Sequence, residues 1–110
     1  MTDICIVHCT TDSQENAEVI ATQLIEQRLA ACVQIVPGIT SVYRWDNKLA
    51  QDQEWLLLIK THRQLLDRAE QLVNALHSYD VPQWVVVAAE TVSPAYGTWV
   101  EQELNIEKRN

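Results

Sequence analysis

The stretch Arg28–Leu49 constrains the fold more than any other part of the chain. It begins as the end of a helix, continues as an apolar run that Pro37-Gly38 interrupts, and becomes a β-rich segment that closes at Asp46-Asn47. Asn tolerates a positive φ angle nearly as well as Gly does, so Asp46-Asn47 predicts a two-residue hairpin turn. The stretch therefore predicts a long β-hairpin in the middle of a small domain.

Length and charge restrict the classes of function. The 110 residues suit a single domain spanning 1–110, because two domains would each be too small to bury much core. The net charge of −7 argues against nucleic acid or an anionic membrane as a partner. The three cysteines form neither a disulfide framework nor a CxxC metal motif, and the first residues lack the pattern of a signal peptide. We therefore expect a cytoplasmic protein.

Apolar runs and helical periodicities alternate along the chain in the order β-α-β-β-α-β-α. Strands are expected at 4–10, at 32–36 continued by 39–45, at 48–61 and at 84–91. Helices are expected at 13–31, where Asp12 and Glu15 have the spacing of a capping box, after Thr61, which is expected to cap the helix with Gln64 in the capping-box position, and after Ser93. Two βαβ units joined by a hairpin predict an α+β, ferredoxin-like split-βαβ sandwich whose antiparallel sheet has the order 4-1-3-2.

The expected hairpin is too long for the helices beside it. The strand at 48–61 would span roughly 45 Å at ~3.3 Å per residue, whereas the helix after it would span roughly 24 Å. The apolar residues of the overhang need another cover. We expect a second subunit to supply it, through an interface that contains Ile39, Val42, Tyr43 and Trp45. The alternative is that bulges shorten the hairpin and the C-terminal helix folds over it.

Several motifs together resemble one family. L-A-A-C-V at 29–33 leads into P-G-I-T-S-V-Y-R-W at 37–45, a strand from Glu54 ends in I-K-T, and H-S-Y-D-V-P follows at 77–82. In combination they resemble the CutA family, the divalent-cation tolerance proteins, over residues 4–104. The resemblance implies a ferredoxin-like fold and a homotrimer in which the hairpin extends across a neighbouring subunit. It also implies a role in tolerance of divalent metals such as copper.

Cys9 is the first candidate metal ligand. It lies at the end of the first expected strand, just before a helix N-terminus, which favours a thiolate. The alternative is a small buried residue that packs under the helix. His8 should point to the opposite face, and Cys5, about 13 Å away, is too far to share an ion. In CutA proteins the matching cysteine has been proposed as a copper ligand.

His77 is the second candidate. The strand order brings the end of the first strand and the end of the second helix to the same edge, so His77 and Cys9 should approach each other. Sulfur and imidazole together suit copper or zinc. The alternative is a histidine that interacts with the helix C-terminus and with solvent. The family's loop usually ends in a Glu proposed as a metal ligand, and here that position is Gln83, a much poorer ligand.

Other ligand and activity classes are less well supported. Tyr79 and Trp45 are candidates for a pocket wall, with Lys48 and Lys60 as candidates to hold an anion there. The alternative is that these residues belong to interface packing and a solvated hairpin. A second hypothesis for function is a trimeric signalling module similar to PII proteins, which would bind a small anion or nucleotide between subunits. A third hypothesis is a structural trimer that acts through a partner surface. No nucleophile–base pair, paired carboxylates or phosphate loop is recognisable, so we do not expect an enzyme.

Overall fold

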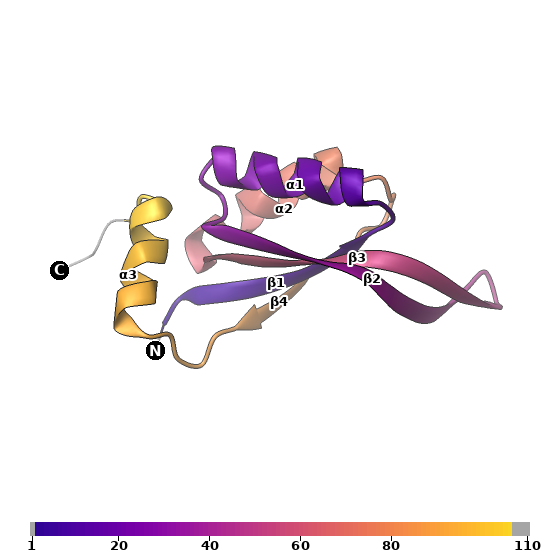
Figure 1. Ribbon diagram of the computed structural model, residues 1–110. Helices are drawn as coiled ribbons and strands as arrows, with labels where there is room; N and C mark the ends of the chain where they lie inside the picture. Colours follow the sequence, from indigo (N-terminus) through magenta and orange to yellow (C-terminus); the bar gives the residue numbers. More distant parts are fainter. Residues whose placement is uncertain (1, 107–110) are drawn as a thin grey trace.

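The computed structural model describes residues 2–106 and contains four strands and three α-helices (Figure 1). In chain order the elements are β1 (Ile4–Thr11), α1 (Gln14–Glu26), β2 (Cys32–Trp45), β3 (Lys48–His62), α2 (Leu66–Leu76), β4 (Val85–Ala88) and α3 (Pro94–Glu103). A single 3₁₀ turn, η1 (Arg63–Leu65), precedes α2. The predicted order β-α-β-β-α-β-α is therefore confirmed. None of the helices within 2–106 is both long and apolar enough to cross a membrane.

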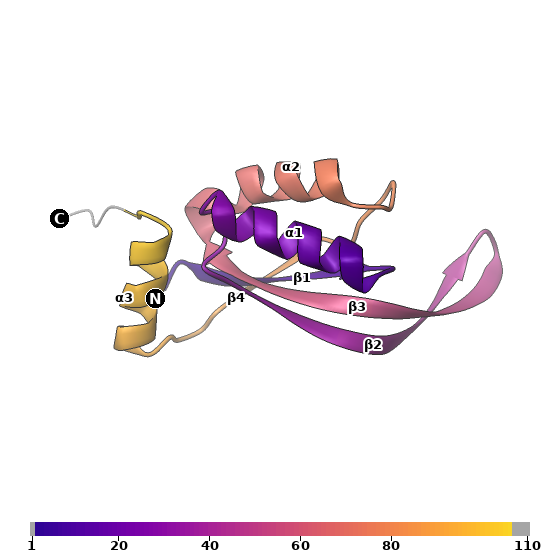
Figure 2. The same ribbon diagram turned by 45° about the horizontal axis from the view of Figure 1, so that its top comes forward.

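The four strands form one antiparallel sheet in the order β2-β3-β1-β4, which confirms the predicted order. The helices α1 and α2 lie side by side on one face of this sheet, as Figures 1 and 2 show from two directions. Between these layers lies the core, whose largest fully buried side chains include Val7, Ile20, Leu24, Leu57, Ile59 and Val73. The apolar runs of β1 and β3 occupy the two central positions, where both backbone edges are paired and α1 and α2 cover the buried side chains. The ferredoxin-like α+β sandwich is thus the observed fold.

Helix α1 begins one residue later than the predicted capping box requires. Ser13 is the N-cap, and its hydroxyl group accepts a hydrogen bond from the backbone N–H of Asn16 at 3.1 Å. The carboxylate of Asp12 is instead the acceptor for the hydroxyl group of Ser78 at 2.8 Å. The prediction of Asp12 as the cap is therefore wrong, because this carboxylate is used to hold a distant loop.

The same helix ends well before the predicted limit of Ala31. Its last residue is Glu26, and Arg28 adopts a left-handed conformation with φ 55°. The backbone N–H groups of Leu29 and Ala30 then both donate to the carbonyl oxygen of Leu24, at 2.9 and 3.2 Å. These bonds satisfy the carbonyl of the last helical turn and direct the chain back to the sheet. Leu29 and Ala30 stay buried without being helical.

The start of α2 also differs from the prediction. Thr61 does not cap it: its side chain is fully buried and donates to the carbonyl oxygen of Leu29 at 2.7 Å. Strand β3 continues to His62, whose Nδ1 accepts from the backbone N–H of Gln64 at 3.1 Å. Strand β4 is shorter than the predicted 84–91, since only Val85–Ala88 pair with β1.

The hairpin of β2 and β3 extends far beyond the helices, as Figure 2 shows. One register shift, between Val36 and Ile39, is located at Pro37-Gly38, and pairing then continues to Trp45 and Lys48. Asp46 and Asn47 both have positive φ angles, 52° and 62°, as the predicted two-residue turn requires. Helix α3 lies at the opposite end of the sheet (Figure 1), so the alternative in which it covers the hairpin is wrong.

Candidate functional site

The loop 77–83 lies against the end of β1, as predicted for His77. The Nε2 atom of His77 is 2.8 Å from the carbonyl oxygen of Thr10, the residue after Cys9. The backbone N–H of Tyr79 donates to Nδ1 of the same ring at 3.0 Å. A carbonyl can only accept and an amide N–H can only donate, so this geometry fits a neutral ring with its proton on Nε2. Both nitrogen atoms of His77 are thus engaged in holding the loop.

Two further contacts join this loop region to the chain that follows β1. The side-chain amide of Asn16 donates to the carbonyl oxygen of Leu76 at 3.0 Å and accepts from the hydroxyl group of Thr11 at 2.5 Å. The Ser78–Asp12 hydrogen bond lies beside them. The loops at this edge of the sheet are therefore held together by side-chain hydrogen bonds, which position the residues that follow.

Cys9 is fully buried on the face of β1 that α1 and α2 cover. Burial, with a further contribution from the charge of Glu54, raises the pKa of the Cys9 thiol from 9.0 to about 12. This direction is opposite to the thiolate expected at a helix N-terminus, because desolvation disfavours the charged form. His8 is half-buried and alternates with Cys9, in agreement with the prediction that they face opposite sides. Cys9 thus corresponds to the packing alternative in this conformation.

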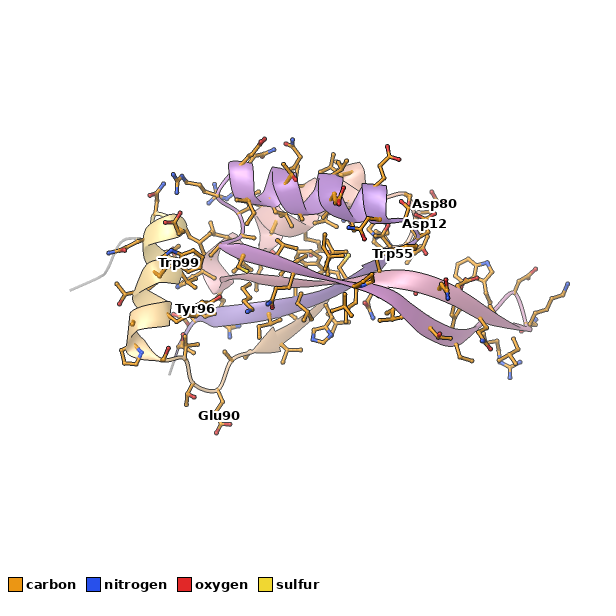
Figure 3. All side chains as sticks on the ribbon, viewed as in Figure 1. Asp12, Trp55, Asp80, Glu90, Tyr96 and Trp99 are labelled. Carbon is orange, nitrogen blue, oxygen red and sulfur yellow. The ribbon has the colours of Figure 1, made fainter. Side chains whose placement is uncertain are left out.

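A cavity of about 530 Å³ opens where the hairpin leaves the helical layer. Its aromatic lining residues are Tyr43, Trp45 and Tyr79, so the prediction that Trp45 and Tyr79 share a pocket wall is confirmed. The polar lining residues are Thr10, Glu54, Ser78, Asp80 and Gln83. In Figure 3 the labelled side chains of Asp12 and Asp80 lie together at this junction.

The charge of the cavity is opposite to the one expected from the sequence. Neither Lys48 nor Lys60 is among its lining residues, and the ammonium group of Lys60 lies 5.6 Å from the ring centre of Tyr96 instead. Carboxylates of Glu54 and Asp80 line the wall. The hypothesis that lysines hold an anion beside Tyr79 and Trp45 is therefore wrong for this arrangement.

Glu54 is the residue that sequence reasoning missed. It is only 7% exposed, and Oε2 accepts a hydrogen bond from the hydroxyl group of Tyr79 at 2.7 Å. Burial and this hydrogen bond raise the pKa of Tyr79 above its usual range. On the same hairpin face, the hydroxyl group of Tyr43 donates to Asp52, and this bond raises the pKa of Tyr43. The sequence signal that could have identified Glu54 is its position directly before the apolar run 55–59 of a central strand.

The donors in this region do not form a metal centre. Within residues 2–106, no three side chains of His, Cys, Asp or Glu gather around one point. Cys9 is protonated and shielded, His77 uses both ring nitrogens, and Gln83 contributes a neutral amide to the cavity wall. A protein zinc site normally has at least three donor side chains around one point, and this arrangement does not supply them.

Comparison with known proteins identifies the family. The sequence pattern of the family described as CutA1 divalent ion tolerance protein matches residues 5–103. The chain belongs to this family. It is 43% identical over 97 residues to the divalent-cation tolerance protein CutA of Thermus thermophilus, covering 88% of this chain and 94% of that protein. Its structure matches the crystal structure of CutA from Xylella fastidiosa with a TM-score of 0.92 and 37% identity, covering 94% of this chain and 99% of that one.

Some CutA relatives are longer, and their names place them in different compartments. The chloroplastic protein CutA of Arabidopsis thaliana is 41% identical over 96 residues, which are 87% of this chain and 53% of that protein. The chain therefore spans about half the length of this plant relative. The CutA from Archaeoglobus fulgidus, at a TM-score of 0.89 and 31% identity over 92% of this chain and 98% of that one, is described as periplasmic.

Proposed function

We propose that this CutA1-family chain acts as a homotrimer in tolerance of divalent cations such as copper, as an assembly or binding protein and not as an enzyme. The observation that carries the proposal is the hairpin that projects past the helices (Figure 2). Val42, Trp45 and Leu49 on it are 61%, 68% and 80% exposed. Exposed apolar residues concentrated on two long paired strands are typical of a surface that another chain covers.

The edges of the sheet support the same proposal. Strands β2 and β4 are its two edge strands, and Val85, Val86 and Val87 of β4 are all exposed. Because successive strand residues point to opposite faces, both faces of β4 lack cover within the chain. A closed ring of copies would cover these edges and the hairpin at once. The number of three copies rests on the resemblance to CutA proteins.

The assembly is tested by sedimentation at micromolar concentration. A homotrimer has three times the chain mass of 12.6 kDa. A monomer at this concentration would overturn the proposal. The tolerance role is tested separately, by growth of a host that lacks this gene over a series of Cu²⁺ concentrations. Unchanged growth on removing and restoring the gene would contradict it.

Direct binding of copper is a second proposal, with Cys9 and His77 as its ligands. What supports it is the position of the His77 ring beside Thr10, one residue from Cys9. Binding would require Cys9 to lose its proton and its cover, and His77 to release Thr10 or Tyr79. Isothermal titration with Cu²⁺ and Zn²⁺ is the test, with Cys9→Ser as the control. No saturable site in the native protein would leave tolerance to the assembly alone.

The cytoplasm is the compartment that we propose, since all three cysteines are free thiols, as in most proteins of reducing compartments. A signalling role with a bound nucleotide or other small anion is less well supported. The lining of the cavity includes the carboxylates of Glu54 and Asp80 and contains neither Lys nor Arg. A nucleotide that raises the melting temperature would support that role, because a ligand bound only by the folded state must stabilise it.

A further inference from the structure

The cavity beside the hairpin contains a buried carboxyl group, that of Glu54, which forms no ion pair among residues 2–106. Glu54 lines the cavity and is only 7% exposed. The ion pairs among residues 2–106 are Arg28–Glu103 and Arg63–Asp3, and neither includes it. Tyr79 donates one hydrogen bond to Oε2, and this neutral hydroxyl group is not a cationic partner for the carboxyl group. Buried carboxylates are rarely left in this state, because desolvation of a charge is costly.

The walls around Glu54 favour a particular kind of cation. Tyr43, Trp45 and Tyr79 supply aromatic rings, whose faces attract ammonium and guanidinium groups. Asp80 adds a second carboxylate at the rim of the same cavity. A combination of aromatic faces and carboxylates is typical of sites for organic cations, since the rings contact the alkyl groups and the carboxylate takes the charge.

The dimensions separate an organic cation from a bare metal ion. The cavity volume of about 530 Å³ lies within the range of small-molecule sites, roughly 300–1,000 Å³. Metal ions instead require several donors at short distances around one point, and residues 2–106 supply no group of three such side chains. The observations therefore favour an extended ligand with one positive group.

We propose that this cavity binds a small organic cation, an alkylammonium or guanidinium group, with its charge on Glu54 and its alkyl part against the aromatic ring of Tyr79, which is hydrogen-bonded to Glu54. The cation has two sources of the same chemistry: a free small molecule, or a basic side chain of a second copy. Arg44 and Lys48 are exposed near the end of the hairpin and are the side chains that a second copy would insert. The proposal does not rest on the tolerance function, and it survives if that function fails.

The test uses the whole chain and four probes of matched size: butylammonium, propylguanidinium, butanol and butyrate. Binding is measured by titration calorimetry and by the change in tryptophan fluorescence. In whichever form leaves the cavity open, the native protein or a variant of the hairpin end, we expect saturable binding of the two cations, at least about tenfold tighter than of butanol, and no binding of butyrate. Equal binding of butanol and butylammonium would overturn the proposal, because the cavity would then select only apolar groups.

The decisive variant is Glu54→Gln, which keeps an acceptor for Tyr79 and removes the charge. We expect it to weaken binding of both cations by about tenfold or more. The control is Glu90→Gln, which removes the same charge from an exposed residue that Figure 3 places far from Asp12 and Asp80. Asp80→Asn, in the exposed loop, tests the site independently if Glu54→Gln does not fold, with an expected loss of about threefold. Unchanged affinity in the folded variants would overturn the proposal.

The two sources are separated by variants of the hairpin end. If a second copy supplies the cation, the native protein binds neither probe, and Arg44→Ala or Lys48→Ala opens the cavity to butylammonium. If a free molecule is the ligand, the native protein binds the probes and neither variant strengthens the binding. Absence of binding in the native protein and in both variants would overturn the proposal for either source.

Discussion

The hydroxyl group of Tyr79 donates a hydrogen bond to Oε2 of Glu54 across 2.7 Å. This bond joins the loop after α2 to β3 at Glu54, the residue directly before Trp55, where the pairing of β3 with β1 ends. The His77 ring positions Tyr79 for this bond. It accepts a hydrogen bond from the backbone N–H of Tyr79, and its Nε2 atom is hydrogen-bonded to the carbonyl oxygen of Thr10. The chain of contacts from β1 to β3 thus determines where the cavity wall lies.

Replacing Tyr79 by Phe should destabilise the protein. The change leaves the buried carboxyl group of Glu54 without its hydrogen-bond donor, and a buried polar group left unsatisfied costs about 1–3 kcal/mol. The measurement is the free energy of unfolding from urea denaturation, with Tyr96→Phe in α3 as the matched control. Equal changes in the two variants would show that the Tyr79–Glu54 bond has no special contribution.

The two glycines of the chain should respond in opposite ways to replacement by alanine. Gly38 has φ 68°, and a Cβ atom there would meet no atom within 4 Å, so Gly38→Ala adds only backbone strain of about 1 kcal/mol. Gly97 lies within α3, and its Cβ would make ordinary contacts of 3.6 Å with Val92 and 3.8 Å with Ile4. Gly97→Ala should therefore stabilise the protein by a few tenths to about 1 kcal/mol. Thermal unfolding of both variants measures the difference, and a shift of the same sign in both would contradict the assignment of strain at Gly38.

A charge on the hairpin should break the proposed trimer. Val42 is exposed on β2, and Val42→Asp would place a carboxylate in the expected interface, where it loses its hydration without a partner. We expect sedimentation velocity to show a shift from trimer to monomer at micromolar concentration. Val19→Asp is the control, because Val19 is a similarly exposed valine on α1, in the helical layer. A trimer that survives Val42→Asp would remove this part of the hairpin from the interface.

Much of the fold follows from the sequence, because long apolar runs and helical periodicities determine the element order and the central strands. The Asp46-Asn47 turn was also readable, since few residues adopt two successive positive φ angles. The end of α1 could not be predicted. The helix stops because Arg28 adopts a left-handed conformation, and arginine gives no sequence signal of that conformation. The helix is ended by the hydrogen bonds from the backbone N–H groups of Leu29 and Ala30 to the carbonyl oxygen of Leu24.

The candidate site was predictable only in part. Trp45 and Tyr79 were recognised as wall residues, but Glu54 reads locally as an ordinary polar residue at a strand start. It is opposite Ile39, directly after the register shift at Pro37-Gly38. A sequence pattern does not reveal on which side of a shifted register a side chain lies. The sign of the charge in the cavity therefore had to come from the structure.

The Cys9 thiol should make stability depend on pH above 9. In the unfolded chain this thiol ionises near its ordinary pKa of 9.0, whereas burial raises the pKa in the folded protein to about 12. Above pH 9 the unfolded state therefore binds fewer protons than the folded state, and the free energy of unfolding falls as pH rises toward 12. Relative to Cys9→Ala, which cannot ionise, the native protein should lose roughly 1 kcal/mol per pH unit in this range.

The measurement is urea denaturation of the native protein and of Cys9→Ala between about pH 8 and 10.5, where the difference between the two is followed so that other titrating groups cancel. The matched control is Cys32→Ala, since Cys32 is half-buried on the edge strand β2. If the native protein instead became more stable relative to Cys9→Ala as the pH rises, the folded state would favour the Cys9 thiolate. That result would contradict the buried thiol and support Cys9 as a metal ligand, so the same experiment also tests the direct binding of copper.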